Sequence, residues 1–265
     1  MGIKIIISVF LFVLGGAFAS FAGVVAFRTP KGQSIVKPDS YCPSCKCKIK
    51  PYDNIPIFSY IFLGGKCRNC KAKIGAFSFL CELFGAIGFA SAYLMYGDSL
   101  KKLPLMLGLI LLVFLFLVMS AIDRETHEVY NVTLVLFGLI AALVVAYRVI
   151  ALRGDLVDHL VGCALGFVFF LSISLIGKYI MKKDALGVGD IYIVGIGGFL
   201  LGAFQLLLSI LLATLLGSIV ELLKIKLGRS KRENEIAFAP YLLLGIGIMA
   251  IFGEEIMNFY WKVVL

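Results

Sequence analysis

Long apolar segments separated by short polar connections make up most of this chain. Four runs contain no Asp, Glu, Lys or Arg: residues 5–27, 104–122, 160–177 and 191–220. An α-helix needs about 20 apolar residues, at about 1.5 Å each, to cross the hydrocarbon core of a bilayer. Each run is close to that length or longer. The pattern therefore predicts an all-α polytopic membrane protein.

The same pattern predicts how many helices there are and where they divide. We expect about eight transmembrane helices, near residues 5–27, 76–97, 104–122, 132–148, 158–177, 190–205, 207–223 and 238–258. The stretch 190–223 is short for two crossings, with a turn expected at Gly202–Gln205. Residues 1–27 then form a first helix, residues 28–75 a loop domain, and residues 76–265 a seven-helix core.

The distribution of charge orients these helices in the membrane. The chain is 61% hydrophobic and 15% charged with a net charge of +9, whereas a soluble domain is about half apolar and a quarter charged. If the N-terminus lies outside, 19 of the 25 Lys and Arg residues face the cytoplasm, as the positive-inside rule requires. The basic balance is thus explained by the membrane, and we expect no nucleic-acid partner.

The first apolar run also has the features of a secretory signal. Lys4 precedes it, and Ala17-Phe18-Ala19 resembles a small-residue cleavage site. The run continues to Phe27, however, and Arg28 follows it as an anchor on the inner side. This length favours a retained transmembrane helix.

The loop domain carries two cysteine pairs. Cys42-Pro43-Ser44-Cys45 and Cys67-Arg68-Asn69-Cys70 are separated by 21 residues. Two such pairs fit tetrahedral Zn²⁺, and four thiolates leave no open position, so the predicted zinc-ribbon-like site is structural. Two alternatives stay open: a pair of disulfides, which a reducing cytoplasm disfavours, and Cys47 in place of Cys45.

Two carboxylates lie at predicted helix ends on the cytoplasmic side. Asp123 follows the run 104–122, and Asp190 closes Gly187-Val188-Gly189-Asp190. Paired carboxylates can share a proton and act as general acid and general base. We expect Gly187 and Gly189 to allow left-handed backbone and close approach of a substrate strand. The alternative is that Asp190 only caps a helix and Asp123 is solvated.

Glu82 is a third acidic residue of interest, inside the second apolar segment. Ionisable groups within a membrane segment are costly and are commonly partnered or functional. A contribution to substrate or cofactor binding and a purely structural role are both open.

Several motifs together resemble the type IV prepilin peptidases, membrane aspartic proteases with a Gly-x-Gly-Asp motif. The resemblance covers nearly the whole chain and includes both aspartate motifs. Its remaining elements are Gly15 to Arg28, Lys37-Pro38, the two cysteine pairs, Tyr52-Asp53-Asn54-Ile55-Pro56, Phe79-Leu80-Cys81-Glu82-Leu83 and Phe238-Ala239-Pro240-Tyr241. Departures from the family pattern occur at Tyr192, commonly Lys, and at Val129-Tyr130, commonly an apolar residue and Pro.

The resemblance implies a function and a place for it. Such an enzyme removes the leader of prepilins or pseudopilins after a Gly, usually before Phe, at the cytoplasmic face of the bacterial inner membrane. Asp123 and Asp190 would be the catalytic pair. Members with a cysteine-bearing loop typically also methylate the new N-terminus with S-adenosylmethionine, and no sequence motif here locates that cofactor.

Two other classes of function compete with this interpretation. A proton-coupled transporter would use paired carboxylates as a relay, but it predicts repeats and sites near the bilayer midplane. A non-catalytic zinc-bearing scaffold for pilus or secretion assembly predicts that Asp123→Asn is silent.

Overall fold

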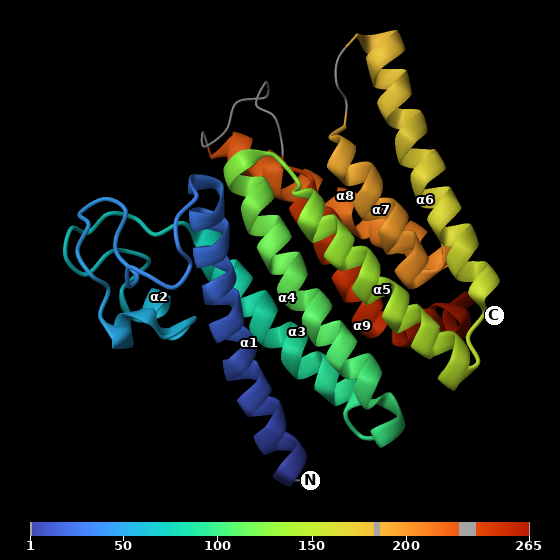
Figure 1. Ribbon diagram of the computed structural model, residues 1–265, viewed down its shortest axis with the longest axis horizontal. Coiled ribbons are helices and arrows are strands. Elements are labelled where there is room, and N and C mark those ends of the chain that lie inside the picture. Colours follow the sequence, from blue (N-terminus) through green and yellow to red (C-terminus); the bar gives the residue numbers. More distant parts are fainter. Residues whose placement is uncertain (1, 183–185, 228–236, 265) are drawn as a thin grey trace.

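The computed structural model describes residues 2–182, 186–227 and 237–264 as a bundle of helices (Figure 1). The described helices are α1 (Gly2–Arg28), α2 (Phe58–Phe62), α3 (Ala76–Tyr96), α4 (Leu103–Thr126), α5 (Asn131–Leu152), α6 (Leu156–Ile176), α7 (Val188–Leu201), α8 (Ala203–Lys226) and α9 (Ala239–Val264). Short 3₁₀ turns cover Thr29–Lys31, Pro51–Asn54 and Leu100–Lys102, and a π turn covers Gly177–Met181.

The predicted all-helical membrane fold is confirmed. Seven of the described helices are long and apolar enough to cross a membrane, all except α2 and α7. The eighth expected helix is α7, which is apolar but has only 14 residues. It meets α8 at Gly202, whose φ of 87° is one that glycine adopts readily. The break expected within residues 190–223 therefore lies at the predicted turn.

Small residues allow pairs of helices to approach closely. A Cβ on Gly15 of α1 would lie 2.2 Å from the carbonyl oxygen of Gly85 in α3. A Cβ on Gly162 of α6 would lie 2.4 Å from the carbonyl oxygen of Gly198 in α7. Membrane helices associate largely through such close packing, because lipid is as apolar as the side chains it replaces.

The main core lies where α4, α5, α7 and α9 meet. α4 is the most buried of the candidate membrane spans. Its Phe116 packs edge to face against Phe137 of α5, with ring centroids 4.9 Å apart, and Ile193 and Leu243 bring α7 and α9 into the same cluster. Because α4 and α7 are held from several sides, the residues at their ends are firmly placed.

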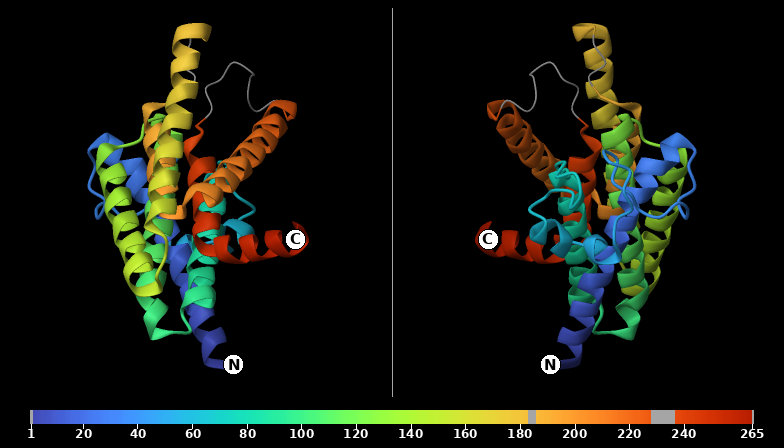
Figure 2. Two further views of the ribbon diagram at one scale, coloured as in Figure 1. Left: turned by 90° about the vertical axis from the view of Figure 1, so that its right-hand side faces the viewer. Right: turned by 90° about the vertical axis from the view of Figure 1, so that its left-hand side faces the viewer.

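Two parts of the chain extend from this core. Residues 29–75 lie beside α1 (Figure 1). The C-terminal part of α9 turns away from the bundle (Figure 2), where Tyr260 and Trp261 pack with Phe204 of α8. Aromatic groupings of this kind are common at membrane–water interfaces. Four of the basic residues counted on the cytoplasmic side, Lys183, Arg229, Lys231 and Arg232, lie outside the described residues.

Candidate active site and metal site

Asp123 lies in the last turn of α4. Its residue is only 6% exposed, and the helix ends shortly afterwards at His127, whose left-handed backbone (φ 53°) lets its N–H donate to the Asp123 carbonyl at 2.7 Å. The Oδ2 atom of Asp123 is buried without a hydrogen-bond partner among the described residues. A buried polar atom left in this way is costly, which makes it a candidate for contact with water or substrate.

Asp190 occupies the first turn of α7. Gly187 has extended backbone before the helix (φ −65°, ψ 142°), and its carbonyl accepts a 3.1 Å hydrogen bond from the Asp190 N–H. Asp190 is 8% exposed. The positive end of the helix dipole favours a carboxylate at this position.

The structure brings the two predicted carboxylates together at one end of the bundle. Asp123 and Asp190 lie near enough for their charges to interact, although they are 67 residues apart in the chain. Two like charges in a site of low polarity favour sharing one proton, which gives one general base and one general acid. This is the arrangement that acid–base hydrolysis requires, and catalysis by the pair stays a prediction.

The left-handed backbone expected at the two glycines is wrong, while close approach of a substrate strand stays a prediction. Neither Gly187 nor Gly189 has a positive φ. Gly189 is needed for a different reason: a Cβ there would lie 2.6 Å from Cγ2 of Val129, in the segment that follows α4. The missing side chain therefore lets the Asp123 segment and the start of α7 approach each other.

The four predicted cysteine ligands form one cluster. The Sγ atoms of Cys42, Cys45, Cys67 and Cys70 all lie within 4.8 Å of one another, and all are free thiols. The two pairs have matching turns, in which Lys46 N–H donates to the Cys42 carbonyl and Lys71 N–H to the Cys67 carbonyl. The cluster fits a metal ion, as predicted, and the alternative of disulfides finds no support.

The surroundings favour the thiolate form at two of the four cysteines. The Cys47 N–H and the Asn69 amide lower the pKa of Cys45 to about 6, and the N–H groups of Cys70 and Asn69 lower the pKa of Cys67. Cys47 stays outside the four and accepts a 3.0 Å hydrogen bond from Asn69. Thiolates are the form that binds Zn²⁺, and hydrogen bonds to them orient the ligands. The donor set therefore fits zinc.

Glu82 has a partner in the loop domain. Its Oε2 accepts a 2.7 Å hydrogen bond from the Ile57 N–H. Ile57 has φ 65° and ψ −56°, and Phe58 N–H donates to the Pro56 carbonyl at 2.7 Å, which together make a strained γ-turn. Glu82 thus holds the loop domain to α3. The structure shows this contact, and a role in cofactor binding stays a prediction.

Arg28 has a larger role than the sequence indicated. The sequence indicated only a positive anchor at the end of the first helix. In the structure Arg28 is buried, and its guanidinium donates to the carbonyls of Ser34 at 3.0 Å and Pro38 at 2.7 Å. A lone Arg between an apolar helix and a long polar loop was the available signal. It could not show which carbonyls Arg28 binds.

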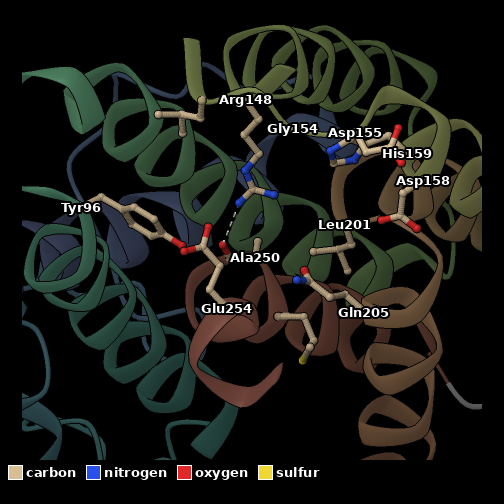
Figure 3. A pocket seen from close by; sticks show the side chains of 12 residues that line it. Tyr96, Arg148, Gly154, Asp155, Asp158, His159, Leu201, Gln205, Ala250 and Glu254 are labelled. Atoms are coloured by element: carbon tan, nitrogen blue, oxygen red, sulfur yellow. Dashed lines mark hydrogen bonds between the residues drawn. The ribbon is translucent and has the colours of Figure 1, made fainter. Parts of the chain in front are cut away.

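A polar cavity lies at the other end of α7 from Asp190 (Figure 3). It has a volume of about 240 Å³, and Arg148, His159, Gln205 and Glu254 line it. Arg148 donates to the carbonyl of Leu200, near the C-terminus of α7, at 3.3 Å. Asp190 is at the opposite end of the same helix. This cavity is therefore separate from the paired carboxylates.

Comparisons with known proteins agree with the motifs. The bacterial peptidase A24 N-terminal domain matches residues 13–96, and the type IV leader peptidase family matches residues 109–222. A prepilin leader peptidase/N-methyltransferase of Bacillus subtilis is 29% identical over 96% of this chain and 98% of its own length. Proteins of the same description from Pseudomonas aeruginosa (32%; 86% and 76%) and Klebsiella pneumoniae (34%; 77% and 90%) are also similar. No solved structure gives a significant match.

Proposed function

The chain belongs to the type IV leader peptidase family, and we propose that Asp123 and Asp190 are the catalytic pair with which it removes prepilin leaders. Family membership makes it a multi-pass membrane prepilin peptidase. The observation that supports the residue assignment is the burial of two carboxylates on separate helices, α4 and α7, whose ends approach each other where Gly189 faces Val129. The transporter alternative finds no such support in the comparisons.

Hydrolysis by this pair needs one ionised and one protonated carboxyl group. The ionised Asp takes a proton from the attacking water, while the protonated Asp donates a hydrogen bond to the scissile carbonyl. The proton gained from water then passes to the leaving amine as the C–N bond breaks. Burial favours a shared proton because two adjacent charges are costly in a site of low polarity. Asp123 and Asp190 titrate as a unit, so the two roles belong to the pair.

The proposed setting is the bacterial inner membrane, with the N-terminus outside and the active site at the cytoplasmic face. The excess of Lys and Arg in the loops of one side supports this orientation. The substrates would be prepilins or pseudopilins with a Gly-Phe-like junction. Their long apolar helix would reach Asp123 and Asp190 from within the bilayer.

A second activity, methylation of the new N-terminus, is proposed from the printed names of the relatives, which include N-methyltransferase. S-adenosylmethionine would supply the methyl group. Cys42, Cys45, Cys67 and Cys70 would hold a structural Zn²⁺. A four-thiolate site has no open position for water, so the metal would shape the loop domain without entering the reaction.

Leader cleavage by single variants tests the assignment. Asp123→Asn and Asp190→Asn should each lower the rate by roughly 10³-fold or more, because the pair acts as a unit. The assay would use protein in nanodiscs, a prepilin with a Gly-Phe junction and intact mass of the product. Glu125→Gln, at an exposed carboxylate two residues from Asp123, is the matched control. Near-normal cleavage by either Asn variant would refute the assignment of the catalytic pair and would favour the alternative of a non-catalytic scaffold.

A further inference from the structure

The tip of the loop domain, residues 54–65, presents apolar side chains at its surface. We propose that this tip re-enters the bilayer and that lipid acyl chains cover its outer side. The stretch contains no Asp, Glu, Lys or Arg. Its apolar patch consists of four side chains that are 48% to 84% exposed: Ile55, Phe58, Ile61 and Phe62. A patch of this kind marks contact with a membrane or with another protein.

Contacts of the tip place it beside the membrane-spanning part of α1. Pro56 packs on Gly16, where an added Cβ would lie 3.2 Å from the Cβ of Pro56. Gly16 is in the middle of α1, and α2 lies beside that part of the helix (Figure 1). From Gly16 to Arg28 the helix rises by about 18 Å, and the hydrocarbon core of a bilayer is about 30 Å thick. Because Arg28 ends the apolar run, the tip lies within the hydrocarbon layer.

The apolar patch continues the exposed apolar surface of two membrane helices. Val13, one turn from Gly16 on the same side of α1, is 57% exposed. On α3, Phe79 stacks on Tyr60 of α2 with ring centroids 4.9 Å apart, and the neighbouring Leu80 is 42% exposed. Both α1 and α3 are long and apolar enough to cross a membrane. The lipid that surrounds these helices would therefore also cover α2, which favours lipid over a protein partner.

Backbone hydrogen bonds of the tip suit a lipid environment, where protein must supply the acceptors that water cannot. Six N–H groups donate to carbonyls within the tip itself: those of Phe58, Ser59, Ile61, Leu63, Gly64 and Gly65. The Ile57 N–H donates instead to Oε2 of Glu82 in α3 at 2.7 Å. Ionisable groups inside a membrane segment are commonly partnered. Re-entry of the loop domain therefore also accounts for Glu82 within the apolar segment of α3.

Charged residues flank the tip on both sides. Asp53 precedes it and accepts a 2.7 Å hydrogen bond from Arg68, so that the two charges offset each other. Lys66 follows it, and a long Lys side chain can extend its ammonium group toward the lipid headgroups. The tip would thus anchor the loop domain, and the cysteine cluster with it, at the membrane surface.

Tryptophan fluorescence of the full-length protein in nanodiscs tests the re-entry. The chain has one tryptophan, which Trp261→Phe removes. In this background, Phe62→Trp should emit at short wavelength and lose most of its emission when the lipids carry bromine on their acyl chains. Gln33→Trp, in the exposed turn that follows α1, is the matched control and should keep most of its emission. Zinc content and melting temperature show that each variant is folded.

A second measurement uses the unaltered chain. Lipids with a photoreactive diazirine in the acyl chain should label residues 54–65 and spare residues 42–49 of the cysteine cluster, as mass spectrometry of the peptides would show. Absence of label from residues 54–65 would overturn the re-entry. The tryptophan at position 62 would then emit at long wavelength if water covers the patch, or at short wavelength without quenching if a second copy or another protein does. Neither measurement depends on leader cleavage, so the result is independent of the proposed function.

Discussion

Gly189 shows how little room surrounds the paired carboxylates. It precedes Asp190, and both Cβ and Cγ2 of Val129 would lie within 2.7 Å of a Cβ placed on it. Val129 is β-branched and has few rotamers in which to move away. A methyl group at position 189 must therefore push the segment after α4 away from α7, and with it the relation between Asp123 and Asp190.

We predict that Gly189→Ala lowers the cleavage rate at least about tenfold, because small displacements at reacting groups are costly. Val129→Gly should restore part of the rate in the double variant, since it removes the atoms that the added methyl group would meet. Gly23→Ala is the control, because a Cβ there meets nothing within 4 Å. Kinetics in nanodiscs give the comparison. A normal rate for Gly189→Ala alone would contradict the packing described.

At the scale of single residues, the sequence predicted which residues form the candidate site better than it predicted which residues contact one another. Asp123 and Asp190 could be assigned to one side because the count of Lys and Arg sets the topology. The contact between Gly189 and Val129 could not be predicted, since it joins the start of α7 to the loop after α4, and their approach depends on the packing of these two helices. For the same reason the expectation of left-handed glycines was wrong, and at Gly189 the small size serves close approach instead.

Among the elements, α3 holds the loop domain through the hydrogen bond of Glu82 and through stacking of Phe79 on Tyr60, with ring centroids 4.9 Å apart. Glu82→Ala would leave the part-buried Ile57 N–H without its acceptor, a loss of about 1 kcal/mol. We predict faster hydrogen exchange at residues 54–62 in this variant. Glu82→Gln keeps an acceptor oxygen and should exchange nearly as wild type does. Equal exchange in the Ala and Gln variants would show that the contact does not hold the loop domain.

Element boundaries were predictable wherever an apolar run ended in charge, and less so elsewhere. The turn at Gly202 was found because two helices had to share one run. The short length of α7 was expected from the same run, but its bounds were not: the helix covers Val188–Leu201 and not 190–205, because α8 already begins at Ala203. The docking of the loop domain was also not predictable, because Arg28 and Glu82 bind backbone groups that no sequence pattern marks.

At the scale of the whole molecule, we expect loss of the metal to unfold the loop domain and to leave the helix bundle intact. A loop domain of this size has little core, so metal binding contributes much of its folding free energy. We predict about one zinc per chain, lost in Cys42→Ser/Cys67→Ser. Proteolysis within residues 42–70 should then become roughly tenfold faster or more. Elemental analysis and mass spectrometry of the fragments provide the measurement.

Cys163→Ser is the control for that experiment, because Cys163 lies in α6 outside the cluster. It should keep the zinc and resist protease. A wild-type protein that is fully folded and contains no metal would contradict the prediction. The cluster itself was predictable from spacing alone, because each cysteine pair folds as a local turn.

The shortness of α7 bears on how a helical substrate reaches water. Fourteen residues of helix span about 21 Å, whereas the hydrocarbon layer is about 30 Å thick. Such hydrophobic mismatch is relieved by local thinning of the bilayer. If Asp123 and Asp190 are the catalytic pair, as proposed, Asp190 at the end of this short helix would lie where the lipid surface is drawn inward. A prepilin could then remain membrane-embedded while its scissile bond meets solvent, and the enzyme would not need to extract its substrate from the bilayer.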